Sequence, residues 1–163
     1  MLASWQEAQL VGGRPAERRR VVPPENLHVT LAFLGHRPAA EVPAVVAELG
    51  AAAAAARPVE LRPVSYRETR SVGMVVLDDV GGAAGALADD LQGRLERLGI
   101  LRRERRPWLP HITVVRFRER AGLAPALPNT CSIRVVRSAL YRSLPGPGGA
   151  RYESLATAAL GGQ

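Results

Sequence analysis

Two of the three histidines in the chain begin the same short pattern. The stretches "HVTLAF", which starts at His28, and "HITVVR", which starts at His111, each contain a histidine, an apolar residue, a threonine, two apolar residues and a large residue. Residues i and i+2 of a strand lie on the same face, so Thr30 accompanies the first histidine and Thr113 the second. This repetition indicates one site built from two imidazoles and two hydroxyls.

Two imidazoles suit a hydrolysis in which water loses a proton while the departing oxygen gains one. An imidazole has an unperturbed pKa near ~6.5, so one ring can be neutral and the other protonated, and each typically contributes roughly 10²–10⁴-fold in rate. The hydroxyls of Thr30 and Thr113 and the guanidinium of Arg116 are donors that would stabilise negative charge as it develops in the reaction. This scheme requires no metal or cofactor, and the histidine spacing differs from that of zinc enzymes.

A single histidine or threonine in a strand is usually structural, which is how we interpret His36. Arg116 and Phe33 lie five residues after their histidines. Strict alternation would put them on the opposite face, unless the strand bends, bulges or ends there. Phe33 is interpreted either as a base-stacking residue or as a core aromatic. Trp108 and Tyr66 are further candidates for stacking on a base.

The net charge of +7 and the pI of about 11.1 favour a polyanionic partner such as RNA, DNA or a phosphorylated small molecule. All 22 basic residues are arginine, a bias that GC-rich coding also produces. We therefore interpret the clusters at 18–20 and 102–106 as solvated loops.

The 163 residues, 47% of them apolar, are enough for one domain with its own core. No run of eighteen apolar residues and no secretory signal pattern is found, so we expect a cytoplasmic protein without a membrane partner. Cys131 is the single cysteine, which excludes an intrachain disulfide and suits a reducing compartment.

Periodicity predicts helices that alternate with strands and hairpins. This order favours an α/β (α+β) fold with a mixed or antiparallel sheet over a doubly wound parallel one. The histidine motifs fall in separate strands, which we expect to belong to different lobes. The predicted strands are 27–34, 59–66, 72–77, 111–117, 132–141 and 152–160, the last two forming a hairpin, and the predicted helices are 39–55 and 83–98, the second capped by Gly99.

The segments "PPENLHVTLAFLG" and "PHITVVRF" resemble the two motif regions of the 2H phosphoesterases. The closer resemblance is to the bacterial and archaeal RNA 2',3'-cyclic phosphodiesterases, also called 2'-5' RNA ligases or LigT-like proteins. The segment "RSALYRSLPGPGGARYESL" resembles their closing hairpin, so the resemblance runs from about residue 21 to the end.

This resemblance implies a single bilobal domain over residues 1–163, with outer helices and a central cleft between two pseudo-symmetric lobes. It implies hydrolysis of RNA 2',3'-cyclic phosphate ends to 2'-phosphates, with His28 as general acid and His111 as general base. By the same resemblance Arg116 binds phosphate. Two alternatives stay open, namely an RNA-end or nucleotide binding module with little turnover, and reversible 2'-5' RNA ligation.

Family members usually begin with an apolar strand and a long helix, whereas this chain opens with "MLASWQEAQLVGG". That opening resembles the end of the family's helix, so we expect the family's first strand to be missing. A sheet without this strand would expose an edge. We therefore expect a monomer, or a dimer in which a second chain covers that edge.

Overall fold

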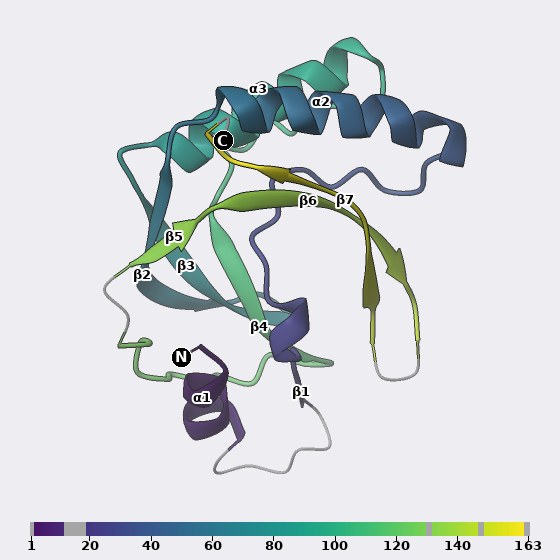
Figure 1. Ribbon diagram of the computed structural model, residues 1–163. Helices are drawn as coiled ribbons and strands as arrows, with labels where there is room; N and C mark the ends of the chain where they lie inside the picture. Colours follow the sequence, from purple (N-terminus) through teal and green to yellow (C-terminus); the bar gives the residue numbers. More distant parts are fainter. Residues whose placement is uncertain (1, 12–18, 130–131, 147–148, 162–163) are drawn as a thin grey trace. The chain divides into compact units, whose positions relative to one another are not determined.

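The computed structural model describes residues 2–11, 19–129, 132–146 and 149–161 (Figure 1). The inference from Cys131 lies outside the described residues. The chain divides into two compact units, and the single bilobal domain stays a prediction. Unit 1 comprises Met1–Thr30, Leu61–Asp78 and Leu109–Ile133, and unit 2 comprises Leu31–Glu60, Asp79–Trp108 and Arg134–Gln163.

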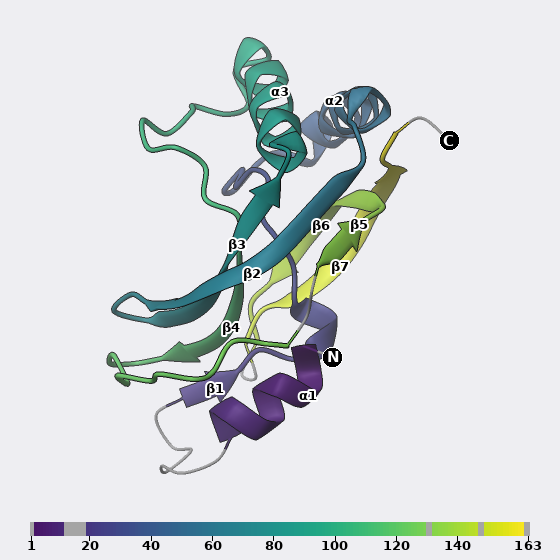
Figure 2. The same cartoon turned by 90° about the vertical axis from the view of Figure 1, so that its left-hand side faces the viewer.

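A five-stranded sheet supplies most of unit 1, in the order β1-β4-β3-β2-β5 (Figure 2). The two neighbours of β4, β1 and β3, both run antiparallel to it. A short helix α1 (Leu2–Gln6), continued by the π-helical turn η1 (Glu7–Val11), precedes the sheet. The strands are β1 (Arg19–Val21), β2 (Val59–Glu68), β3 (Val72–Val80), β4 (His111–Phe117) and β5 (Ile133–Val135).

Unit 2 consists of two helices and a hairpin, in which α2 packs against α3 and against both hairpin strands. A 3-10 turn, η4 (Ala39–Glu41), leads into α2, whose first turn accommodates Pro43 as the sequence predicts. The remaining elements are α2 (Val42–Ala55), α3 (Ala83–Arg97) and the antiparallel strands β6 (Arg137–Leu144) and β7 (Arg151–Ala159).

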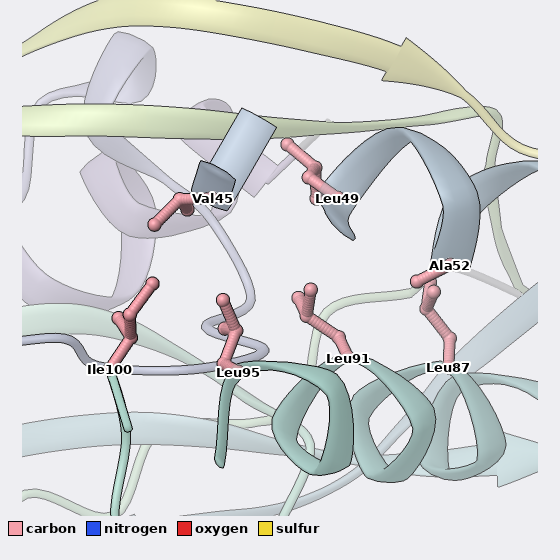
Figure 3. Packing of buried hydrophobic residues seen from close by; sticks show 7 residues of the cluster. All are labelled: Val45, Leu49, Ala52, Leu87, Leu91, Leu95 and Ile100. Atoms are coloured by element: carbon pink, nitrogen blue, oxygen red, sulfur yellow. The ribbon is translucent and has the colours of Figure 1, made fainter. Parts of the chain in front are cut away.

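The core of unit 2 forms where apolar side chains of the two helices point toward one another (Figure 3). Their spacing of three or four residues puts them on one face of each helix. Burying one leucine side chain stabilises the fold by roughly 1.5–3 kcal/mol, so this row holds the helices together. The cluster is Val45, Leu49 and Ala52 of α2, Leu87, Leu91 and Leu95 of α3, and Ile100 after it.

Gly99 ends α3 with a φ of 70°, a backbone conformation that glycine adopts without strain, so the predicted cap is confirmed. The α+β class with antiparallel sheets is confirmed as well. Within the described ranges no helix is long and apolar enough to span a membrane.

Two predicted strands need correction. The predicted strand over 27–34 is wrong: a 3-10 turn, η3 (Pro24–Asn26), precedes it, and only Val29 forms a bridge. Pro23 and Pro24 lack N–H groups and interrupt the pairing with β4 between Val22 and Val29. The predicted strand over 132–141 is two strands, because β5 joins the five-stranded sheet whereas β6 pairs with β7.

Candidate active site

The first histidine motif pairs directly with the strand that carries the second. Val29 forms an antiparallel bridge with Ile112 of β4, and Ile112 pairs with Val75 of β3 on its other side. All three residues belong to unit 1. The expectations that the motifs come from different lobes and that a central cleft lies between those lobes stay predictions.

This bridge sets the register of the four motif residues. In an antiparallel pair His28 comes opposite Thr113, and Thr30 comes opposite His111. Opposed residues share a face, and that face alternates along each segment, so all four side chains lie on the face away from the bridge residues. We call this side of β4 the motif face.

Both imidazoles are oriented by the same local hydrogen bond. Nδ1 of His28 lies 2.7 Å from the carbonyl oxygen of Asn26, and Nδ1 of His111 lies 2.8 Å from that of Leu109. A carbonyl oxygen only accepts, so each Nδ1 carries the hydrogen and donates it. In a neutral ring Nε2 is then the basic nitrogen, and in a protonated ring Nε2 is the second donor. Each histidine can thus exchange a proton through Nε2.

A β-bulge interrupts β4 directly after its Thr113. Thr113 pairs with Met74, but the next pair is Val115 with Gly73, so Val114 is an extra residue with no partner on β3. Val114 and Val115 are both fully buried although they are neighbours in the chain. The bulge therefore shifts the alternation of side chains by one residue.

This shift decides where Arg116 lies. Arg116 pairs with Val72, while Thr113 pairs with Met74. Residues 72 and 74 share a face of β3, so Arg116 lies on the motif face with Thr113 and His111. The condition that the sequence set for Arg116, a bend or bulge within the strand, is met.

The bulge is held by a side chain that the sequence analysis missed. Gln6 of α1 is 2% exposed, and its Nε2 donates to the carbonyl oxygens of Val22 and Val114, each at 3.0 Å. The backbone N–H of Val22 donates to the same Val114 oxygen at 3.0 Å. Burying an amide without partners is costly, so these bonds fix α1 to the bulge. A glutamine within an apolar helical segment was the available signal.

The three aromatic candidates lie in different settings. Phe33 in unit 2 is 82% exposed, so its interpretation as a core aromatic is wrong and base stacking stays a prediction. Tyr66 lies over Gly73, which pairs with Val115 on the face opposite the motif face. Its hydroxyl donates to Glu68 at 3.1 Å, and burial together with that carboxylate raises the pKa of Tyr66. Tyr66 thus has a structural position.

Trp108 lies in unit 2 beside the second arginine cluster. The loop over residues 103–108 and one face of α3 line a pocket of about 390 Å³. Arg103 is paired with Asp89 and Arg106 with Glu104, so the loop is partly held by ion pairs rather than simply solvated. A stacking role for Trp108 stays a prediction.

Among the residues that the structure describes, no group of three or more His, Cys, Asp or Glu side chains is arranged to hold a metal ion. The arrangement on the motif face offers instead two proton-exchanging nitrogens, two hydroxyls and one guanidinium. Such a set can move protons at a phosphate group and stabilise its negative charge.

The family model of the 2'-5' RNA ligase superfamily matches residues 2–146. The chain belongs to this superfamily. A search of curated protein sequences finds no match to this chain. The family predicted from the motifs, the LigT-like 2H phosphoesterases, is confirmed, and membership supports an activity of the phosphoesterase type.

Several solved structures resemble the chain over nearly its whole length. The TT0787 protein of Thermus thermophilus is 31% identical, with a TM-score of 0.81 over 99% of this chain and 92% of that one. LigT of E. coli complexed with 3'-AMP is 26% identical, with a TM-score of 0.78 over 98% and 88%. A structure described as a phosphoesterase is 30% identical, with a TM-score of 0.76 over 98% and 89%.

Proposed function

We propose that this protein hydrolyses RNA ends that carry a 2',3'-cyclic phosphate and leaves a 2'-phosphate. The observation that carries this proposal is the antiparallel bridge at Val29, which puts two imidazoles and two threonines on one face. The superfamily supports phosphoesterase chemistry in general. LigT of E. coli has been seen complexed with 3'-AMP, ATP, NADP+ and phosphate, which supports a nucleotide end as the substrate.

In this mechanism the two histidines divide the proton transfers. Nε2 of His111 takes a proton from the attacking water, and protonated His28 gives one to the departing 3' oxygen. This direction is proposed from the family resemblance, because the motifs are nearly symmetric. Each Nδ1–H bond to a backbone carbonyl favours the proposal, since it leaves Nε2 to exchange the proton in both rings.

The remaining residues of the motif face stabilise the phosphate. Negative charge grows on the non-bridging oxygens as water adds, and the hydroxyls of Thr30 and Thr113 are donors beside the imidazoles. Arg116 supplies a permanent positive charge and a planar set of donors that suits phosphate oxygens. Groups already oriented toward the charge that develops in the transition state lower the barrier without reorganising during the reaction.

The decisive experiment is to incubate the protein, with a chelator present, with an RNA that ends in a 2',3'-cyclic phosphate. The product is then identified by mass spectrometry and by its susceptibility to phosphatase. We expect a 2'-phosphate. A protein that binds this RNA without changing it would instead be an end-binding module, and a joined 2'-5' product would favour the ligase reaction. Hydrolysis should dominate, because water greatly outnumbers RNA hydroxyls.

Three matched variants test the two-histidine mechanism. His28→Ala and His111→Ala should each lose roughly 10²–10⁴-fold in kcat. His36→Ala should keep full activity, since this third histidine lies in an exposed loop of unit 2. For the intact pair, kcat/KM should follow a bell-shaped pH profile whose two apparent pKa values belong to the coupled pair.

An activated aryl phosphodiester separates the two histidines. Its leaving group departs without a proton, so it should partly rescue His28→Ala and leave His111→Ala inactive. The opposite pattern would reverse the assigned roles. Near wild-type activity of both variants on the cyclic RNA end would exclude two-histidine catalysis.

A further inference from the structure

A second arginine lies beside Arg116. In the pairing of β1 with β4, Arg20 stands directly opposite Arg116. Opposed residues of an antiparallel pair share a face, and their Cβ atoms lie about 4.5–5.5 Å apart. Because Arg116 lies on the motif face, Arg20 lies there too. The cluster at 18–20 is interpreted from the sequence as a solvated loop, whereas Arg20 is part of strand β1.

The motif face thus carries three successive pairs along β4. Thr30 opposes His111, His28 opposes Thr113, and Arg20 opposes Arg116. The arginine pair is separated from the middle pair by one two-residue step on β3, which is about 7 Å at ~3.4 Å per residue. This separation is of the order of the distance between neighbouring phosphates in an extended nucleic acid strand.

No acidic residue in the described part of the chain balances the charges of the arginine pair. Both side chains are exposed, and neither forms an ion pair with any residue in the described part of the chain. Like charges directly opposite each other destabilise a strand pair. Two guanidiniums that face each other without an ion pair among the described residues therefore attract anionic groups.

We propose that Arg20, which lies beside Arg116, binds a second phosphate of the substrate, the phosphodiester on the 5' side of the nucleotide that carries the cyclic phosphate. This inference rests on the proposed function. The reacting cyclic phosphodiester carries a single negative charge. The positive charge of Arg116 balances it, and the threonine hydroxyls donate hydrogen bonds to it. A second fixed cation indicates a second anionic group, and an RNA strand supplies one at the next linkage. The site therefore prefers an RNA end to a mononucleotide.

The test measures binding separately from turnover. Titration calorimetry compares a dinucleotide that ends in a 2'-phosphate with a nucleoside 2'-phosphate and with a nucleoside 2',5'-bisphosphate. Arg20→Met should weaken binding of the dinucleotide by about 10-fold and leave the nucleoside 2'-phosphate unchanged, because a charge-assisted bond is lost only in the first case. The salt dependence of dinucleotide binding should become shallower by about 0.7 in log–log slope.

Arg57→Met is the matched control, because it removes the same charge from an exposed residue between α2 and β2. It should leave all three affinities unchanged. Thermal unfolding of Arg20→Met should occur no lower than that of wild type, since one of two like charges has been removed. A lower unfolding temperature together with equal loss on all ligands would make Arg20 structural and overturn the proposal.

The remaining outcomes are equally decisive. Equal weakening of the dinucleotide and the nucleoside 2'-phosphate would assign Arg20 to the reacting phosphate and overturn the second-phosphate site. Unchanged binding throughout would also overturn it. The nucleoside 2',5'-bisphosphate carries a phosphate at the same 5' position as the dinucleotide, so it should also depend on Arg20, and a bisphosphate affinity unchanged by Arg20→Met would overturn the second-phosphate site. If the wild type binds these ligands but hydrolyses no cyclic phosphate, the proposed function fails while the binding data still decide the role of Arg20.

Discussion

Replacing Gly73 by alanine probes the bulge that turns Arg116 toward the motif face. Gly73 pairs with Val115, the residue after the bulge, and its missing side chain makes room for two neighbours. A Cβ atom at this position would overlap the hydroxyl oxygen of Tyr66. It would also lie 2.7 Å from Cγ1 of Val115 and 2.8 Å from Cζ of Tyr66.

These contacts set the size of the effect. Val115 is fully buried, so it cannot move away without displacing its own neighbours. Tyr66 must leave Gly73 and therefore the carboxylate of Glu68, to which it donates. Overpacking of this kind costs roughly 1–3 kcal/mol, and we expect the upper half of that range because a hydrogen bond to a charged group is disturbed too. With about 2–4 °C per kcal/mol for a chain of this size, the Tm should fall by about 4–12 °C.

The assay is thermal unfolding followed by circular dichroism, with two comparison variants. Gly50→Ala adds the same methyl group inside α2, where nothing lies within 4 Å, and should raise stability by roughly 0.5–1 kcal/mol. The double variant Gly73→Ala/Tyr66→Phe removes the overlapping oxygen but keeps the contact with Val115. It should therefore be more stable than the sum of the two single changes predicts, with a coupling of about 1 kcal/mol.

An unchanged or higher Tm for Gly73→Ala would refute this reasoning, because it would mean that Val115 and Tyr66 do not crowd the position. Strict additivity in the double variant would show that Tyr66 is not the residue displaced. Loss of kcat/KM on the cyclic RNA end beyond the loss of folded protein would further link Gly73 to the placement of Arg116.

Three further predictions concern single side chains. Arg116→Lys should lower kcat/KM on a cyclic RNA end by about 10-fold although the charge is kept, because lysine cannot make two parallel bonds to a phosphate; unchanged kinetics would make Arg116 structural. Asp79→Ala should lower the free energy of unfolding, measured with urea, by roughly 0.5–2 kcal/mol, because its carboxylate accepts two backbone N–H groups in the first turn of α3 at 3.0 and 2.7 Å. The neighbouring Asp78→Ala, which removes only an exposed ion pair, should cost about 0–1 kcal/mol, and an equal loss would contradict the capping role. Because the pKa of Tyr66 is raised in the folded protein, the unfolded state loses this proton first, so stability should fall as pH rises above about 10; Tyr66→Phe should flatten that decline in urea titrations at pH 9 to 11.

The sequence predicted the elements whose hydrophobic period is unambiguous. The leucines at 87, 91 and 95 recur at helical spacing and lie in the core of unit 2, and Gly99 ends that helix. The strand over 111–117 was predicted with its observed bounds. Thr113 lies on the same face of β4 as His111 because alternation along a strand is a local property of the chain.

Pairing partners could not be predicted in the same way, because they depend on residues far apart in the chain. The segment around His28 has the composition of a strand, yet only Val29 pairs with β4, and the chain before it turns at two prolines. The support that Gln6 gives to Val114 joins segments more than a hundred residues apart, and no local pattern contains it.

The hydrogen bonds that orient the two imidazoles end on main-chain oxygens, those of Asn26 and Leu109. A point substitution replaces a side chain and leaves the carbonyl in place, so no single mutation of an acceptor residue deletes either bond. In a triad the residue that orients the histidine is itself a side chain and can be lost in one step. Here each histidine carries its orienting group two residues before it in the chain. Substitutions that disturb the orientation of the two imidazoles are therefore expected mainly at His28 and His111 themselves and in the backbone turns that precede them.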